Sequence, residues 1–479
     1  MFNSIVTVEQ AADLLRPHRT KAIRLERVWP PHQKTSLLSQ IGGSPNFPPD
    51  WSWPKIDFPD STSASLDFLA QINLEELPDM EDRDLLPREG MLYFFALSLS
   101  HEPLQTFGSD AWRVLYYPHA PDGLPVRDAP DDAGWAKDYM YYSRMPGWEY
   151  REPGASPASL FPKCPIRFAI AELWAEPEFT GPDDPALGPF AATLLSQQMV
   201  WEPEPLGLTD RLMNLARRFG RPGNLKVPAA STRRNSVDLR EMKMKMLVRD
   251  CLTLVMRDED RGGYDQDKVL EDISLPYRAD DAILLLNAVR NDWLENVMPI
   301  KTVLNSEGKY SDDLLLRYEA WRAQAVDLTQ TLVAIGRQTK LSDEQRERVN
   351  DVLKQHGQLR KEATSCGLIP YNHLALRASL QPLMTAFPDI ANEETELLAS
   401  YDPARDPLLN GPAAHLMLSK VGGIQSDLDP DEVLLLQLAS DCDGPRWKWW
   451  DLGVLRFSIK KDALAAMRFD LAQAEIEGH

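Results

Sequence analysis

The chain has 479 residues, 43% of them hydrophobic and 26% charged, and this length predicts two or three domains. The net charge of −20 and the isoelectric point near 4.9 argue against partners that are themselves anionic, namely nucleic acid and membrane surfaces. The same charge suits a cationic protein partner, although an acidic surface also simply keeps a protein in solution.

The predicted location is the cytoplasm. No stretch approaches the ~18 uncharged apolar residues needed to cross a bilayer. The first residues lack the basic and then apolar segments of a secretory signal. The four cysteines are widely scattered without a CxxC pair, which favours buried thiols over a disulfide framework; they are Cys164, Cys251, Cys366 and Cys442.

The first part of the chain, residues 1–205, is predicted to be rich in β-structure. A capping box formed by Thr7 and Gln10 predicts a short opening helix. Apolar and aromatic runs bounded by Gly-Gly, Pro-Pro and Asp-Gly pairs predict short strands; these runs are TSLLSQI, LDFLAQINL, GMLYFFALSL and WRVLYYP. The proline-rich connections between them cannot be helical.

In residues 206–400 the apolar residues recur with helical spacing, which predicts an inserted helical domain. Its clearest helix follows Ser311 and carries apolar residues spaced alternately by four and three; these are Leu314, Tyr318, Trp321, Ala325, Leu328, Leu332 and Ile335. A capping box at Ser342 and Gln345 opens the next helix, whose apolar stripe is Val349, Val352, Leu353 and Leu359. The short turn between them favours an antiparallel hairpin near 311–360, with a dimerising coiled coil as the alternative.

Residues 401–479 again show the short apolar runs of the first part of the chain. Three runs predict strands; they are HLMLSKV, VLLLQLAS and GVLRFSIK. The closing segment DALAAMRFDLAQAEIE has an apolar period that predicts a final amphipathic helix.

Three blocks of the first part recur in the same order in the last part. LSQIGG (38–43) matches LSKVGG (418–423), LAQI (69–72) matches LLQL (435–438), and GMLYF (90–94) matches GVLRF (453–457). This repeat predicts two similar β units that pack together, since neither is large enough to bury a core alone. The predicted fold is therefore α+β, with two similar β-rich units interrupted by the helical insertion.

The repeat carries six motif residues. Two Gly-Gly pairs, Gly42 with Gly43 and Gly422 with Gly423, are expected to form the turn after the first strand of each unit. Gln71 and Gln437 interrupt otherwise apolar strands, where a buried amide is unfavourable without hydrogen-bond partners. We expect each amide to bind the backbone of a neighbouring segment.

These motifs resemble the YwqG-like family (domain of unknown function 1963) over roughly residues 30–120 and 412–475. The residues that carry the resemblance are SQIGGSPNFPPDWSWP, LDFLAQINLEELP and LPREGMLYFFAL, then SKVGG, LLLQLAS and WWDLGVLRFSI. Family members are typically shorter, so the resemblance implies that the helical block is an insertion. Some members are encoded beside toxin or secretion-system genes, which implies an immunity role for part of the family.

The sequence contains no recognisable catalytic, nucleotide or metal motif, so we predict no cofactor, no metal and no catalytic residue. The histidines form no HxH or HxxxH pair, and neither a phosphate-binding glycine motif nor a GxSxG elbow is present. The acidic turn DLDPDE lacks the glycine and the glutamate of a calcium loop. Asp441 and Asp443 are typical of a turn between strands.

An aromatic and basic cluster is the candidate partner-binding site, because tryptophan and arginine anchor many interfaces. It consists of Arg446, Trp447, Lys448, Trp449, Trp450 and Asp451, with Trp51 and Trp53 in a loop of the first unit. The alternative is that these rings cap a small β core. The leading functional hypothesis is a non-catalytic immunity protein that binds a cationic toxin enzyme. The alternatives are a hydrolase with an unrecognised site between the β units, and a structural scaffold.

Overall fold

The computed structural model contains all 479 residues as two compact units, residues 1–20 with 172–263 and residues 21–171 with 264–479. Apart from a few single positions, the structure describes residues 7–29, 37–97, 106–119, 123–133, 163–175, 276–292, 312–337, 339–363, 414–421, 428–441 and 453–478.

The first unit opens with helix α1 (Val8–Leu15), which the capping box predicted. The Thr7 hydroxyl accepts from the Gln10 backbone N–H, and the Gln10 amide oxygen accepts from the Thr7 N–H. A 3₁₀ turn, η1 (Arg16–His18), follows. In the same unit, the Arg19 guanidinium lies 4.4 Å from the Trp174 ring centroid and pairs with Glu172.

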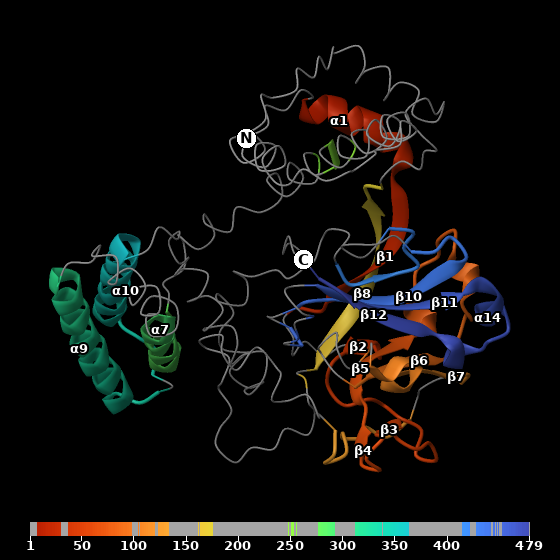
Figure 1. The fold of residues 1–479 in the computed structure, drawn as a ribbon, viewed down its shortest axis with the longest axis horizontal. Coiled ribbons are helices and arrows are strands. Elements are labelled where there is room, and N and C mark those ends of the chain that lie inside the picture. Colours follow the sequence, from red (N-terminus) through yellow and green to blue (C-terminus); the bar gives the residue numbers. More distant parts are fainter. Residues whose placement is uncertain are drawn as a thin grey trace, which may run out of the picture. The chain divides into compact units, whose positions relative to one another are not determined.

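The second unit is built on a ten-stranded sheet in the order β12-β11-β10-β9-β1-β8-β2-β5-β6-β7. Figure 1 labels most of these strands. Its strands are β1 (Thr20–Arg27), β2 (Gln40–Ile41), β5 (Asp67–Asn73), β6 (Met91–Ala96), β7 (Trp112–Tyr117), β8 (Cys164–Leu173), β9 (Leu416–Met417), β10 (Glu432–Ala439), β11 (Val454–Lys460) and β12 (Gln473–Glu477). Short 3₁₀ turns connect several of them; these are η2 (Leu74–Glu76), η3 (Arg83–Leu85) and η4 (Gly108–Ala111).

The strand order contains the predicted repeat. Four strands of the first copy, β2-β5-β6-β7, and four of the second, β9-β10-β11-β12, flank the central pair β1 and β8 in opposite directions. One edge strand, β7, is joined to the residue that precedes the other, β12, because the Trp112 indole N–H donates to the Ala472 carbonyl at 2.8 Å. This order is the one expected of two copies related by an approximate twofold.

The pairing of the strands also repeats. In β5 and β10, the glutamines Gln71 and Gln437 lie two residues after a break in the register with the neighbouring strand, at Leu69 and Leu435. Such a bulge adds one unpaired residue and increases the local twist of the strand. Because the bulge occurs at the same place in both copies, the second and third blocks of the sequence repeat are structurally equivalent.

The register predicted for the first block is wrong by four residues. The Gln71 amide donates to the carbonyl of Leu38, and the Gln437 amide donates to that of Ala414, so Leu38 is equivalent to Ala414 and not to Leu418. The sequence comparison placed the two Gly-Gly pairs opposite each other. In the structure, the residue equivalent to Gly42 is Leu418, whose φ of 51° is close to the 64° of Gly42. Gly422 and Gly423 lie outside the described residues.

The predicted closing helix is also wrong. Only α14 (Lys461–Ala465) is α-helical; a 3₁₀ turn, η11 (Phe469–Leu471), follows, and β12 then pairs antiparallel with β11. Met467 has φ = 55°, a left-handed conformation that ends the helix. Residues 473–477 therefore form a strand paired with β11, although the spacing of their apolar residues is helical.

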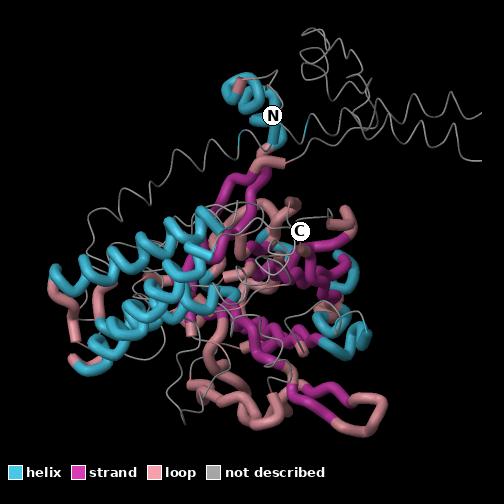
Figure 2. The backbone as a smooth tube through the Cα atoms, turned by 60° about the vertical axis from the view of Figure 1, so that its left-hand side comes forward, coloured by secondary structure: helices cyan, strands magenta, loops and turns pink. Residues whose placement is uncertain are grey.

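Three helices form a second hydrophobic core within this unit, and two of them are the predicted hairpin (Figures 1 and 2). They are α7 (Ala279–Asp292), α9 (Asp312–Ala334) and α10 (Asp343–Ala363). The buried residues of α9 are those of the four-three seam, and Val349, Val352, Leu353 and Leu359 face them from α10. The Trp321 indole N–H donates to the Val352 carbonyl at 2.8 Å, which joins the two helices directly.

The fold is α+β, with two β-rich regions and a helical segment between them in the sequence. Among the helices that the structure describes, none has the length and apolar character to span a membrane. The proposed domain boundaries at 205 and 400 fall on residues outside the described ranges and stay a prediction.

Candidate functional site

The Gly42–Gly43 turn fixes the loop that follows β2. Both glycines have positive φ, 64° and 73°, and their N–H groups donate to the carbonyls of Leu69 and Phe161. A Cβ on Gly43 would lie 2.7 Å from the Cβ of Lys163, so only glycine fits here. The turn directs the chain out of the sheet toward Trp51.

The side chain of Gln71 anchors this loop through hydrogen bonds to the backbone. Its side chain is fully buried, its oxygen accepts from the Asn46 N–H at 2.7 Å, and its amide donates to the Leu38 carbonyl at 2.6 Å. The Tyr93 hydroxyl donates to the Asn46 carbonyl at 2.6 Å, and burial raises the pKa of Tyr93 well above its usual value. These polar groups are satisfied by backbone, as expected from the sequence, and their role is structural.

The second copy contains a buried ionic cluster at the corresponding place. Gln437 is also fully buried, and its amide donates to the Ala414 carbonyl at 2.8 Å. The neighbouring His415 accepts from the Ala439 N–H on Nδ1, as Ser39 accepts from the Asn73 N–H in the first copy. The same backbone hydrogen bond is therefore present in both copies, with a histidine as acceptor in the second copy and a serine in the first.

His415 Nε2 lies 3.2 Å from Asp441 Oδ2, and the Arg27 Nε lies 3.0 Å from the same oxygen. Because Nδ1 already accepts a hydrogen bond, the proton belongs on Nε2, which donates to the carboxylate. Burial alone would raise the pKa of Asp441, but Arg27, His415 and the Gly444 N–H outweigh burial and lower it. All three side chains are buried, so this cluster links β1, the residue before β9 and the chain after β10.

Two residues of the predicted partner-binding cluster lie in the core. Trp447 and Trp449 are fully buried, and both indole N–H groups donate to the Ala439 carbonyl, at 2.8 and 3.1 Å. Trp447 also packs edge-on against Phe161. These two rings cap the β core, which is the alternative that the sequence left open. The other members lie outside the described residues; they are Arg446, Lys448, Trp450 and Asp451.

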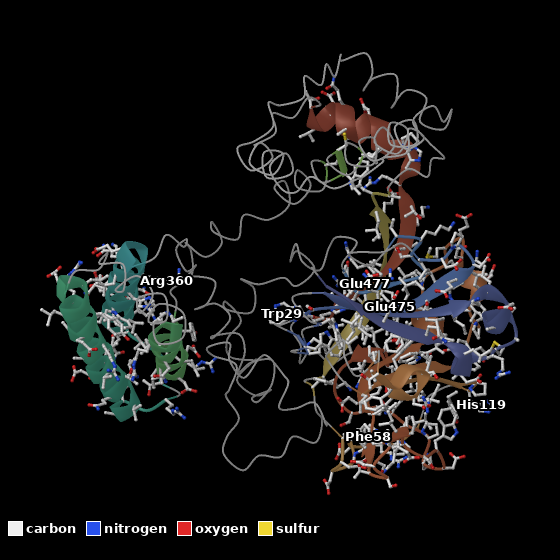
Figure 3. All side chains as sticks on the ribbon, in the orientation of Figure 1. Trp29, Phe58, His119, Arg360, Glu475 and Glu477 are labelled. Atoms are coloured by element: carbon white, nitrogen blue, oxygen red, sulfur yellow. The ribbon has the colours of Figure 1, made fainter. Side chains whose placement is uncertain are left out.

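The loops beside the first copy form a lobe that keeps aromatic rings at the surface. We call residues 44–66, 117–119 and 123–133 the aromatic lobe; it contains the hairpin of β3 (Lys55–Asp57) and β4 (Ser63–Ser65). Its segments are tied together because Phe47 N–H donates to the Pro125 carbonyl and Arg127 N–H to the Pro45 carbonyl. Figure 3 labels Phe58 and His119, two members of the lobe.

Trp51 and Tyr117 are half-buried in this lobe and meet nearly at a right angle. Their ring centroids are 5.7 Å apart with an interplanar angle of 81°. Trp51 also packs edge-on against Phe47, and Tyr117 packs edge-on against the exposed His119. The Arg127 guanidinium donates to the Trp51 carbonyl at 2.6 Å, and this bond holds the backbone of Trp51 in place.

The lobe is acidic. Six of its carboxylates are exposed, against two cationic side chains, Lys55 and Arg127. The carboxylates belong to Asp50, Asp57, Asp60, Asp128, Asp131 and Asp132. Lys55 is 2.9 Å from Asp132, so its charge is already matched within the lobe. An aromatic surface with this charge offers sites for apolar and cationic groups.

The sequence located Trp51 but gave no sign of its neighbours. Tyr117 ends a strand more than sixty residues later, and Asp441 was interpreted only as a turn residue. A signal for the lobe does exist, since the proline-rich segment 45–59 carries two tryptophans and two phenylalanines. Within the described part of the chain, no three His, Cys, Asp or Glu side chains are grouped as metal ligands.

The fold and the lobe define a class of protein with a duplicated β unit, in which one copy carries a surface elaboration that the other copy does not repeat among the described residues. The chain belongs to the family described as Domain of unknown function (DUF1963), which it matches over residues 39–164 and 307–477. The matched segments include β2 to β7, the hairpin of α9 and α10, and β9 to β12. A search of curated proteins found no match.

Proposed function

We propose that this protein is a cytoplasmic, non-catalytic immunity protein that binds a cationic toxin enzyme stoichiometrically. The observation that carries the proposal is the Trp51–Tyr117 pair, which is only partly buried in an acidic lobe. The wide spacing of the four cysteines supports the cytoplasmic location, because disulfide-stabilised secreted domains usually pair theirs closely.

The lobe has the features of a binding surface that is organised before its partner arrives. Trp51 is braced by Phe47 on one side and by the hydrogen bond from Arg127 to its carbonyl. A rigid aromatic ring loses little conformational entropy on binding and commonly contributes a large share of the affinity. The buried glutamine Gln71 stabilises the base of the same loop.

The charge of the chain supports a basic partner. A net charge of −20 accelerates encounter with a cationic protein and slows encounter with an acidic one. Because long-range attraction is screened by salt, the association rate should fall as ionic strength rises. Dissociation should depend mainly on the aromatic anchors and change little with salt.

The experiment is affinity purification of the full chain from its native host, followed by binding measurements on the recovered protein. Three forms are compared: the wild type, Trp51→Leu, and the control Leu316→Gln, which alters a residue that is 71% exposed on α9. We expect a basic protein that binds at a 1:1 ratio, is lost with Trp51→Leu, and is retained with the control.

Two outcomes would overturn the proposal. Equal recovery of the partner with Trp51→Leu, after its fold is verified by circular dichroism, would move the binding site away from the lobe. Protection of cells from a neighbouring toxin without any physical complex would favour the alternative of an enzyme that reverses the modification made by the toxin.

A further inference from the structure

The Trp51–Tyr117 corner is the most specific feature of the aromatic lobe. Two rings held at 81° present faces to a common space, and the exposed His119 packs against Tyr117 with a centroid distance of 5.3 Å. Each aromatic face carries partial negative charge at its centre, so two faces meeting at a corner attract one positive group between them.

The lobe already binds one guanidinium of its own. The Arg127 side chain lies 5.6 Å from the Phe47 centroid and 6.0 Å from that of Trp53, on the buried side of the cluster. These distances are those of cation–π contacts, which act within about 6 Å of a ring centroid. The rings of this lobe are therefore arranged in a way that accepts a planar cation.

The surroundings of the corner favour a second cation. Asp50 is exposed and precedes Trp51 in the chain, and Asp128 is exposed and follows Arg127. Among the described residues of the lobe, the positively charged side chains are Arg127, which is half-buried and donates to the Trp51 carbonyl, and Lys55, which is paired with Asp132. Exposed carboxylates thus outnumber cations on the same loops three to one.

We propose that the corner between Trp51 and Tyr117 binds a lysine or arginine side chain of the protein partner. This inference rests on the proposed function, because it names the group of the partner that the lobe recognises. The cation lies against both rings, and Asp50 supplies the nearest exposed carboxylate in the sequence.

The test uses the full chain labelled with 5-fluorotryptophan and observed by ¹⁹F NMR, with the Trp51 signal assigned from Trp51→Phe. The probe is the peptide acetyl-Gly-Arg-Gly-amide, and its matched control replaces arginine with citrulline, which has the same shape without the charge. We expect a saturable shift of the Trp51 signal with the arginine peptide, weakened by salt, and little or no shift with the citrulline peptide.

Variants locate the contact. Tyr117→Leu should weaken the arginine peptide about two- to fivefold, the range expected of one exposed cation–π contact. Tyr117→Phe keeps the ring and should bind as the wild type does, and Leu316→Gln on α9 should have no effect. Equal shifts with both peptides, or unchanged binding in a folded Tyr117→Leu protein, would overturn the inference.

The two proposals fail separately. If the arginine peptide does not shift Trp51 while Trp51→Leu still abolishes partner capture, the protein-binding function stands and the cation site falls. If the peptide binds at the corner while no protein is captured from the host, the cation site stands and the immunity function falls.

Discussion

Phe94 and Phe457 occupy equivalent positions in the two copies of the repeat, and their ring centroids lie 5.2 Å apart. Each residue pairs with the position just after the bulge of its neighbouring strand, Ala70 in one copy and Leu436 in the other. Both rings are fully buried. The two copies therefore share one core, and neither is a domain by itself.

This contact should be visible as energetic coupling between the copies. Replacing either Phe94 or Phe457 with Leu removes the edge-to-face ring contact. In the double variant the same contact is lost only once, so its cost should be smaller than the sum of the two single costs. We expect a coupling free energy of about 0.5–1.5 kcal/mol from a double-mutant cycle of urea unfolding. Strict additivity of the two single changes would show that the rings do not stabilise the fold through each other.

The seam of the helical hairpin predicts a contrast between two residues of α9. Leu328 is 4% exposed and Val333 is 52% exposed. Leu328→Ala should lower the free energy of unfolding by about 2–5 kcal/mol, because it leaves a cavity between α9 and α10. Val333→Ala should change it by less than about 0.5 kcal/mol. Thermal unfolding of both variants measures the difference, and similar values would count against the seam.

Gly453 precedes β11, and a Cβ at this position would lie 1.6 Å from the carbonyl oxygen of Glu477. Gly453→Ala should therefore displace β12 and reduce the yield of folded protein severely. The control is Gly108→Ala, where φ is 55° and the space around the Cβ is open, so only backbone strain of about 1 kcal/mol applies. Soluble expression and circular dichroism compare them, and a well-folded Gly453→Ala protein would contradict the close packing.

The ionic cluster predicts how stability depends on pH. The pKa of Asp441 is lower in the folded protein than the 3.8 of an exposed aspartate, so near pH 3.8 the unfolded chain binds more protons. The stabilisation is complete above that value and is lost as pH falls through the folded pKa. Asp441→Asn should cost about 3–5 kcal/mol at pH 7, because it leaves the buried Arg27 without this carboxylate.

Urea unfolding from pH 7 to pH 3 should show the gap between wild type and Asp441→Asn narrowing only below pH 4. The exposed Asp131→Asn protein is the control and should follow the wild type throughout. A gap that stays constant over the whole range would mean that the Asp441 carboxylate does not titrate in this way.

Strands with continuous apolar runs could be predicted from the sequence, but the two central strands could not. β1 reads TKAIRLER, and β8 places Arg167 and the exposed Ile170 within a half-buried pattern, so neither has a clear apolar run. Their identity as strands depends on partners far along the chain, since β1 pairs with β9 and β8 with β2. Such pairing is decided by tertiary context and not by local propensity.

The candidate site shows the same limit. Both tryptophan groups could be identified from the sequence, but not the fact that Trp447 is fully buried while Trp51 is only partly buried. The two situations have similar composition, because a capped core and a binding surface both combine tryptophan with polar neighbours. Only the three-dimensional position of Tyr117 beside Trp51 separates them.

The bond from the Trp112 indole to the Ala472 carbonyl joins residues 360 positions apart, and the pairing of β1 with β9 spans a similar length of chain. During synthesis on the ribosome, β2, β5, β6 and β7 emerge early, but the copy that covers their shared core is translated last. We therefore expect the first copy to lack the second half of their shared core through the synthesis of nearly three hundred residues. We expect the placement of the repeat at the two ends to cause dependence on chaperones before release and slow refolding from denaturant afterwards.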